Sequence, residues 1–469
     1  MPELAHLVPN PALLARTRRR SDRAIGATGP VVLWLQRAQR AYDNPALDLA
    51  ISLGNRLGAP VLAFLAPRPD FPLAQLRHYA FMVQGFAGLQ RDLAARGVPL
   101  VLRAPPQTSL TQFCREVGAR AVVGDEYPLE FSEKWRVAAG QRLPVALWTV
   151  EADLVVPSRA LPAGEFWAAH TLRPKIARQL AQWLEPQPEP VAQVPWAGPL
   201  PRSEDPQDVQ GFLTRMGPLP SLAGAVNLPG GRDAGLRRLQ PWTDGGLANY
   251  MELRDDPSQD GTSMLSPYLH FGQLGPREVA RAALSAEAPE AARLGFVEQL
   301  VVRRELAWHF VTGNPHYATL QGCESWAKKT LAEHLGDRRP YQYSYAQLEA
   351  AQTHDTAWNA AQLQMVRTGW MHNRMRMYWA KQLLLWTADP EQAFAFALQL
   401  NDTYQLDGRD PNGYTGIAWS IGGKHDRPWP PHKPVWGLIR PMVASGLAKK
   451  FNVELYARQQ GTARQPGLL

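Results

Sequence analysis

The chain has 469 residues and a formal net charge of +8, with 45% hydrophobic and 20% charged residues. A chain of this length can bury two or three domain cores, and its positive balance suggests a polyanionic partner. No apolar run approaches the ~18 residues of a membrane span and no signal segment opens the chain, so no membrane association is expected. Two cysteines are too few for a disulfide framework or a Cys-rich metal site. We therefore predict a cytoplasmic protein without a metal site.

Residues 1–28 carry a cluster of basic side chains with little hydrophobic periodicity. The cluster consists of Arg16, Arg18, Arg19, Arg20 and Arg23. Because no apolar pattern indicates what these residues would pack against, we predict a basic N-terminal arm, flexible or irregular in structure.

Residues 29–160 alternate short apolar runs with longer amphipathic stretches. The runs that we expect as buried strands are Val31–Leu35, Pro60–Leu65, Val98–Leu102, Ala119–Gly124 and Pro144–Val150. The clearest helix is expected over Ala74–Arg96, where Gly97 can end it. Strand–helix alternation of this kind predicts a doubly wound, parallel, Rossmann-like α/β domain.

Residues 161–235 are rich in proline and polar residues, which indicates a long interdomain linker. Residues 236–469 show helical apolar spacing and no convincing strand, so we expect an all-helical second domain. The expected helices are Pro276–Ala286, Ala291–Phe310, Ala346–Ala351, Asp355–Trp370, Asn373–Leu385 and Pro390–Leu400. Pro276 suits a first helical turn, and Asp355 and Asp389 suit N-caps.

The stretch LDGRDPNGYTGIAWSIGGKHDRPW, residues 406–429, carries the most chemical information in the chain. We predict a loop here, in which glycines admit a flat ligand and the acids and Asn412 hydrogen-bond its polar edges. The chain also has sixteen tryptophans, more than half of them beyond residue 300. Surfaces that combine tryptophan and arginine suit flavins and unstacked bases.

This stretch and three others resemble class II DNA photolyases of the photolyase/cryptochrome family. The other matching segments are VVLWLQRAQRAYD from Val31, SMLSPYLHFGQLG from Ser263 and THDTAWNAAQLQMVRTGWMHNRMRMYWAK from Thr353. The resemblance covers the chain from about residue 25 onward. It implies a light-driven DNA repair enzyme with an α/β antenna domain and a helical FAD-binding domain.

The resemblance also implies roles for individual residues around FAD. Tyr250, Thr262, Ser263, Met264, Leu265 and Ser266 match the segment that contacts the flavin phosphates, where hydroxyls and N–H groups can cradle a pyrophosphate. Arg376 and Asp407 match the ion pair beside the flavin ring, and Asn401 matches the asparagine that faces its reactive nitrogen. Asp410 and Asn412 are further expected cofactor contacts.

Tryptophans in the same segments match the chain of residues that relays electrons to photoexcited flavin. Trp358, Trp379 and Trp386 are the expected relay, with Tyr343 as a candidate at the surface. Trp379 and Trp386 are seven residues apart, which places them about 10 Å apart on one helix face. The order of the relay cannot be derived from the sequence.

On the substrate side, Trp419 matches the tryptophan that stacks on the damaged bases, and Met377 matches a neighbouring contact. Trp429 lies in the segment expected to fill the gap left by the flipped dimer. Arg254, Arg303, Arg427 and Arg440 are the expected DNA contacts. The partner implied is UV-damaged DNA, bound by a monomer.

Two positions depart from the family pattern. Gln299 stands where a lesion-contacting glutamate is common, and an amide cannot stabilise a dimer radical anion as an acid would. Glu298 is the adjacent acid, but a helix would turn it about 100° away. Arg303 occupies a position that is a lesion-stacking tryptophan in some members. Slower repair or an altered lesion preference is the expected consequence.

These patterns favour light-driven repair of cyclobutane pyrimidine dimers by electron transfer from excited reduced FAD to a flipped-out dimer. The α/β domain is expected to hold a second chromophore, for example a deazaflavin. One alternative is a cryptochrome-like photoreceptor, which Gln299 keeps open. Others are a 6-4 photoproduct enzyme and a flavin-independent nucleic-acid-binding protein. The nearby histidines, His354, His372 and His425, are expected to be structural.

Overall fold

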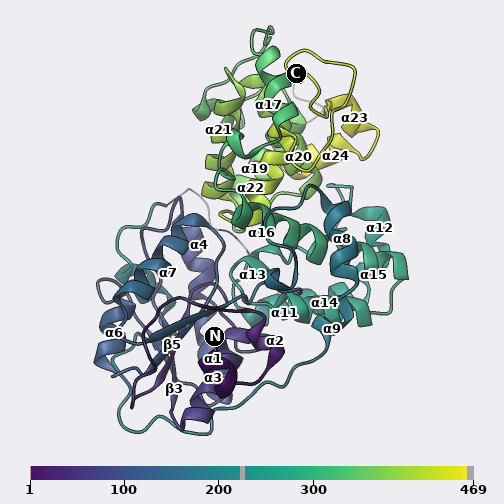
Figure 1. The fold of residues 1–469 in the computed structure, drawn as a ribbon. Coiled ribbons are helices and arrows are strands. Elements are labelled where there is room, and N and C mark those ends of the chain that lie inside the picture. Colours follow the sequence, from purple (N-terminus) through teal and green to yellow (C-terminus); the bar gives the residue numbers. More distant parts are fainter. Residues whose placement is uncertain (1, 222–225, 227, 462–469) are drawn as a thin grey trace.

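The computed structural model describes residues 2–221, 226 and 228–461, so part of the expected linker and the last eight residues lie outside the description. An α/β body holds the N-terminus, and helices α8, α9 and α11 to α24 form a second body beside it (Figure 1). None of the described helices is long and apolar enough to cross a membrane.

A six-stranded sheet forms the centre of the α/β body, in the order β1-β6-β5-β2-β3-β4. Five strands are parallel: β2 (Val31–Leu35), β3 (Val61–Leu65), β4 (Leu100–Leu102), β5 (Ala121–Asp125) and β6 (Ala146–Val150). Alternate residues of β2 pack into different cores. Val31 and Leu33 join the core under α3 (Pro45–Leu57), and Val32 joins the core under α6 (Leu110–Glu116). Helices therefore cover both faces, which confirms the doubly wound domain.

The N-terminal segment is not a free arm, so that prediction was wrong. Helices α1 (Pro2–Leu7) and α2 (Pro11–Leu14) precede β1 (Thr17–Arg19), which pairs antiparallel with β6. Arg16 is buried and donates a 2.6 Å hydrogen bond to the carbonyl of Leu154. Arg20 pairs with the buried Glu126 at 3.0 Å. The sequence did not show these partners because they lie more than a hundred residues downstream.

The long helix expected over Ala74–Arg96 is two helices. Helix α4 (Leu76–Val83) ends before Gly85, and α5 (Phe86–Ala95) begins after it. A Cβ at position 85 would lie 3.1 Å from the Cα of Gly231. The glycine thus allows a distant backbone segment to approach where the helix is interrupted.

The expected linker contains helices that belong to the second body. Helices α8 (Ala169–Ala177) and α9 (Leu180–Leu184) bury Leu172, Ile176 and Trp183 in the same core as α14. Helix α11 (Arg232–Asp244) also packs in this core, whereas α10 (Val209–Arg215) packs on α4 and buries Phe212 in the core of the α/β body. The proline-rich composition indicated a linker. The helices are short and each buries few apolar residues, so no helical apolar spacing was visible in the sequence.

The helical body follows the predicted pattern from Pro276 onward. Its helices include α12 (Tyr250–Leu253), α13 (Ser266–His270), α14 (Pro276–Ser285), α15 (Glu290–Val297), α16 (Arg304–Gly313), α17 (Ser325–Glu333), α18 (Tyr345–Glu349), α19 (Thr356–Thr368), α20 (Asn373–Trp386), α21 (Pro390–Tyr404), α22 (Pro411–Gly422), α23 (Ala444–Ala448) and α24 (Val453–Gln459). A π-helical segment, Glu298–Arg303, links α15 to α16. Asp355 and Asp389 cap α19 and α21 as predicted.

The glycine-rich stretch is a helix rather than a loop from Pro411 to Gly422. The Asp410 side chain caps α22, and Pro411 occupies its first turn. Buried Ile417, Ala418 and Ile421 pack in the core shared by α16, α20 and α21. This packing outweighs the low helix propensity of the glycines, so the prediction of a loop was wrong for residues 411–422, whereas residues 423–429 are irregular as predicted.

A buried ion network joins the two bodies. Arg37, which follows β2, pairs with Asp410 at 2.6 Å and also with Asp153. His270 of α13 contacts the same Asp410 oxygen at 3.1 Å. Burial opposes ionisation of Asp410, but Arg37 and the hydrogen bond from His270 hold the pKa of this carboxyl well below its usual range. The N-terminus of α22 is therefore anchored to the α/β body.

Replacing Arg37 by methionine should destabilise the fold strongly, because the buried Asp410 would lose its arginine partner. The buried Asp153 would keep, among the described residues, only the more distant Arg40, at 3.9 Å. We expect a loss of about 3–5 kcal/mol in the free energy of unfolding, measured by urea denaturation. Arg91→Met is the matched control, because its pair with Asp233 is exposed (59% and 50%). Its loss should stay below about 1 kcal/mol, and equal effects of the two variants would contradict this assignment.

The effect of Arg37→Met should depend on pH. A carboxyl whose folded pKa is lowered stabilises the fold above its unfolded pKa of about 4 and loses that contribution as the pH falls. The difference between the wild type and the variant should therefore shrink in acid.

Candidate functional site

The segment expected to hold phosphates lies at the start of α13. Thr262, Ser263 and Ser266 are all half-buried there, and Met264 has a positive φ of 50°. Arg238 of α11 supports the turn by donating a 2.9 Å hydrogen bond to the carbonyl of Ser263. The structure thus brings the three hydroxyls together in one short, strained turn.

Arg376 of α20 and Asp407, between α21 and α22, form the predicted ion pair. One guanidinium nitrogen, Nη2, lies 3.0 Å from each carboxylate oxygen, and Nε donates to the carbonyl of Met371 at 2.9 Å. The Arg376 side chain is 24% exposed and Asp407 only 8%. The pair is thus fixed from the protein side while the guanidinium retains an accessible surface.

Asn401 belongs to a hydrogen-bonded cluster around Asp402, a residue that the sequence analysis missed. The Asn401 amide donates to Asp402 Oδ1 at 2.8 Å, and Tyr414 donates to Oδ2 at 3.0 Å. The backbone N–H of Arg409 also donates to Asp402 Oδ1, at 2.7 Å. A Cβ at Gly413 would lie 2.9 Å from the Asn401 nitrogen, so α22 approaches this amide closely. The only sequence signal for Asp402 was its place beside Asn401.

Asp410 and Asn412 take part in structural hydrogen bonds that the sequence did not indicate. One Asp410 oxygen accepts from Arg37 and His270, and the other accepts two hydrogen bonds from Asn412, at 3.1 and 2.9 Å. Both oxygens therefore serve the domain junction and the helix cap. A cofactor contact by either residue stays a prediction.

The predicted relay residues form one continuous aromatic chain. The Trp358 ring stacks on Trp379 at 6.1 Å and meets Trp386 edge-on at 5.5 Å. Tyr343 continues the chain from Trp386, again at 5.5 Å. The indole of Trp358 donates to the Trp379 carbonyl, and that of Trp379 donates to Gln362. The geometry gives the order Trp379, Trp358, Trp386, Tyr343, which the sequence could not.

Trp419 rests on a buried cation. The Nζ atom of Lys381 lies 4.4 Å from the Trp419 ring centre and 5.9 Å from that of Trp436, and it donates to the Ser420 carbonyl at 2.9 Å. Burial lowers the pKa of Lys381 to about 7, a shift that Asp426 opposes and Arg440 assists. The sequence gave no signal that Lys381 is buried. Met377, one turn earlier on α20, is half-buried.

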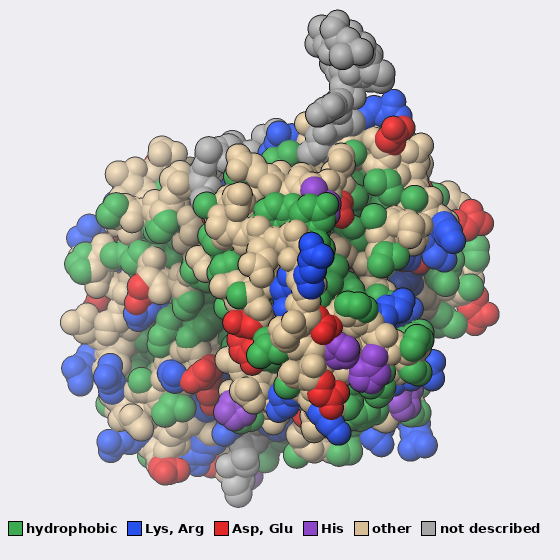
Figure 2. All heavy atoms as spheres, turned by 90° about the horizontal axis from the view of Figure 1, so that it is seen from above, with side chains coloured by type: hydrophobic (Ala, Val, Ile, Leu, Met, Phe, Trp, Pro, Cys, Tyr) green, Lys and Arg blue, Asp and Glu red, His purple; other side chains and the backbone are tan. Residues whose placement is uncertain are grey.

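Trp429 lies between two of the predicted DNA-contacting arginines. The guanidinium carbons of Arg427 and Arg440 lie 5.2 and 4.4 Å from its ring centre, and its indole donates to Asp426. Arg254 instead lies over Tyr250, at 5.0 Å. In the view of Figure 2, Lys and Arg side chains are interspersed with hydrophobic ones. Such a surface suits a backbone-contacting, base-stacking ligand.

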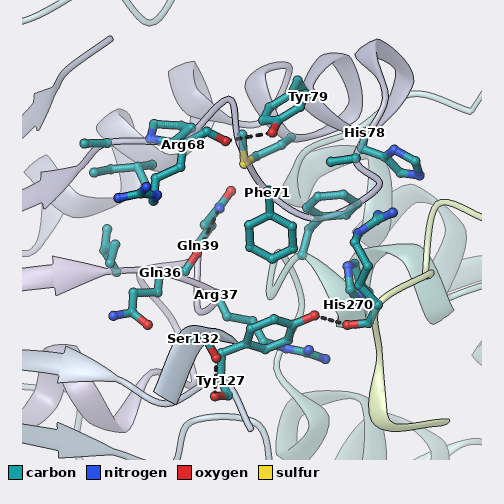
Figure 3. Close-up of a pocket in the computed structure, with 18 of the residues that line it drawn as sticks. Gln36, Arg37, Gln39, Arg68, Phe71, His78, Tyr79, Tyr127, Ser132 and His270 are labelled. Carbon is teal, nitrogen blue, oxygen red and sulfur yellow. Dashed lines mark hydrogen bonds between the residues drawn. The ribbon is translucent and has the colours of Figure 1, made fainter. Parts of the chain in front are cut away.

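A pocket lies in the α/β body, at the carboxyl ends of β2, β3 and β5 (Figure 3). It encloses a cavity of about 140 Å³, with Phe71, Tyr79 and Tyr127 among its walls. Gln36 Nε2 and Gln39 Oε1 are buried in its lining and have no hydrogen-bond partner in the described protein. Parallel α/β sheets bind ligands at such a topological switch point. No residue of this pocket was assigned a ligand-binding role from the sequence.

Comparison with known proteins shows the family of the chain. The family model "DNA photolyase" matches residues 31–192. The chain is 37% identical to the deoxyribodipyrimidine photo-lyase of Methanothermobacter thermautotrophicus over 91% of its length and 93% of that protein. It is 39% identical to the rice (Oryza sativa) protein of the same name, over 91% and 87%. The chain belongs to the photolyase/cryptochrome family.

Solved photolyase structures share the fold. A class III photolyase from Agrobacterium tumefaciens matches with a TM-score of 0.68 at 21% identity, over 92% of this chain and 86% of that one. A Sulfolobus tokodaii photolyase with two FAD molecules matches with a TM-score of 0.67 at 18% identity, over 92% and 89%. Both bodies of the chain thus have counterparts in one known architecture.

This photolyase-family chain differs from the expected pattern in its π-helical segment. Gln299 is half-buried there, while Glu298 forms a bidentate pair with Arg173 at 2.8 and 2.9 Å and bonds Arg303 at 3.2 Å. Glu298 is therefore held by two arginines, and its expected catalytic role stays a prediction. Arg303 is held at the surface by the same carboxylate, with 50% of its side chain exposed.

Replacing Lys381 by methionine should change how stability depends on pH. The folded pKa of about 7 lies below the unfolded value of about 10.4, so the unfolded wild type binds more protons between these values and its stability rises with pH. Met carries no charge, so the variant should be the more stable protein at pH 6 by a few kcal/mol, and its advantage should shrink by pH 9. Urea unfolding at both pH values measures this.

Lys329→Met is the control for that measurement, because the Lys329 side chain is 79% exposed. Its stability should follow the wild type at both pH values. A Lys381→Met variant whose advantage does not vary with pH would contradict a buried, titrating ammonium.

Proposed function

We propose that the chain is a class II cyclobutane pyrimidine dimer photolyase, a light-driven carbon–carbon lyase that repairs UV-damaged DNA. The observation that carries the proposal is the continuous aromatic chain from Trp379 to the surface. It starts on α20 three residues from Arg376, whose pairing with Asp407 suits a charged redox cofactor. The identity to named photo-lyases over 91% of the chain supports the same activity.

The residues of the helical body fit FAD. The hydroxyls of Thr262, Ser263 and Ser266 suit the two phosphates, and the accessible face of Arg376 suits a negatively charged flavin ring. Asn401 offers a neutral amide, held in orientation by Asp402, that can hydrogen-bond the ring without adding charge. Bound in its reduced form, FAD would supply the electron that splits the dimer on excitation.

The protein's own part in repair is to extract and hold the lesion. A stacked dimer cannot reach a buried site, so the dimer must leave the duplex, and its weakened stacking lowers the cost. Trp419 offers a flat face fixed by Lys381 from below, with Met377 on the neighbouring helix face. Trp429, between Arg427 and Arg440, is suited to fill the gap in the duplex. These arginines contribute affinity without sequence preference.

Repair of a thymine-dimer oligonucleotide under blue light tests the proposal. The protein should be purified with its flavin, reduced chemically and illuminated with substrate, while base absorbance is followed. We expect recovery only in the light, and Trp419→Ala should reduce it by about tenfold or more because one stacking face is lost. Arg91→Met, remote from the site, should repair like the wild type. Absence of repair by a reduced, flavin-loaded protein would overturn the proposal.

A cryptochrome-like photoreceptor is the second candidate, because Gln299 cannot act as an acid toward the lesion and Glu298 is held by two arginines. The same experiment separates the two functions. A receptor would photoreduce its flavin through the aromatic chain yet leave the dimer intact. A 6-4 lesion in the same assay tests altered lesion preference.

The pocket of the α/β body supports a second chromophore as antenna. Its aromatic walls suit a flat ring system, and the orphaned amide atoms of Gln36 and Gln39 offer one donor and one acceptor to its polar edge. Gln36 is held in place by Arg136, which donates to its Oε1 at 3.3 Å. His270 and Arg409 of the helical body complete the lining, so the pocket borders the flavin-binding body.

Replacing both Gln36 and Gln39 by leucine should weaken chromophore binding by about tenfold or more, because two hydrogen bonds to the ring edge are lost. Titration of the purified protein with a deazaflavin or a flavin mononucleotide measures this. Repair driven by direct excitation of FAD should be unchanged. Equal affinity of the variant and the wild type would show that the chromophore binds elsewhere.

A further inference from the structure

At its surface end, the aromatic chain contacts His354, a residue that has no part in the predicted relay. Beyond Trp386, the phenol oxygen of Tyr343 lies 2.7 Å from Nδ1 of His354. The His354 ring stacks on Tyr341 at 3.8 Å and meets Trp386 edge-on at 5.3 Å. The Tyr343 N–H also donates to the Trp386 carbonyl at 3.0 Å, which holds Tyr343 against the last tryptophan. Tyrosine, histidine and tryptophan are thus in mutual contact.

The hydrogen bonds around Tyr343 leave its phenol proton free to point at His354. The backbone N–H of His354 donates to the Tyr343 oxygen at 3.0 Å. The O–H of Tyr343 can donate to Nδ1 of His354 when the neutral imidazole carries its own proton on Nε2. His354 is exposed, and a proton taken up there can pass to solvent.

Tyr343 can donate an electron readily only if a base nearby accepts its phenolic proton. Removing an electron from a phenol makes it a strong acid, so the electron leaves readily only when a base takes the proton. The nearby carboxylate of Asp355 is engaged elsewhere, because it accepts from the backbone of Trp358 and from Tyr378. Among the described residues around Tyr343, His354 is the base within hydrogen-bond distance.

We propose that His354 is the proton acceptor that makes Tyr343 the terminal electron donor of the relay, an inference that rests on the proposed flavin photochemistry. A bound, photoexcited oxidised flavin would supply the oxidant that removes one electron from Trp379, and the hole would then move through Trp358 to Trp386. Tyr343 gives one electron to the Trp386 cation radical and its phenolic proton to His354 Nδ1. The residues end as neutral Trp386, a neutral tyrosyl radical and an imidazolium, and the electron lost by Trp379 stays with the flavin. His354, which was expected to be structural, thus takes part in photoreduction as the proton acceptor.

Flash photolysis of the oxidised, flavin-loaded protein tests this role. We expect a tyrosyl-radical absorption in the wild type that is absent in Tyr343→Phe, and a slower Tyr343 oxidation in D₂O. His354→Asn is the decisive variant, because its amide oxygen can occupy the place of Nδ1 and accept the hydrogen bond but cannot take the proton. Its radical yield should fall by about tenfold. A wild-type yield in His354→Asn, or an equal rate in H₂O and D₂O, would overturn the proposal.

Repair by chemically pre-reduced protein separates this inference from the proposed function. Repair does not need the relay once the flavin is reduced, so His354→Asn should repair at the wild-type rate. His170→Asn, another exposed histidine, controls for surface substitution and should keep the full radical yield. If repair occurs but the radical yield is independent of His354, only the inference fails. If no pre-reduced protein repairs, the proposed function fails.

Discussion

The buried contact between Arg37 and Asp410 is the interaction on which the relation between the two bodies depends. Arg37 follows β2 at the switch point of the sheet, and Asp410 caps the helix that carries Trp419. Because unpaired charges are costly in a buried site, this pair specifies one docking of the bodies rather than a range of them. His270 contacts Asp410 and also lines the α/β pocket. One network therefore positions the proposed antenna pocket and the lesion-facing helix together.

Helix α20 organises the chemistry of the helical body. Arg376, Met377, Trp379, Lys381 and Trp386 all lie within its fourteen residues. Arg376 pairs with Asp407, and Lys381 lies against the Trp419 ring. Trp379 and Trp386 both contact Trp358 in the aromatic chain. The residues proposed for electron supply, for charge stabilisation and for support of Trp419 thus lie on one rigid element, which keeps their mutual distances fixed.

The residues predicted to face the DNA include the expected stacking tryptophans, but Gln299 stands where a glutamate was expected. Trp419 and Trp429 are each backed by cations, which strengthens their planar surfaces through cation–π contact. The π-helical segment, in contrast, places an amide at Gln299 and turns Glu298 toward Arg173 and Arg303. Irregular helical turns of this kind often occur at functional sites. The lesion chemistry of this protein is therefore expected to depend on hydrogen bonding more than on proton donation.

The sequence by itself determined the parallel sheet, most helices of the second body and the residues that resemble a flavin site, because periodicity and local motifs are encoded over short distances. It failed at the N-terminal arginines, whose partners lie more than a hundred residues away, and at residues 411–422, where packing outweighs glycine content. Only the tertiary structure decided the burial of Lys381, the order of the relay and the contact of His354 with Tyr343. Each of these depends on distances between separate elements, which arise only when the helices pack.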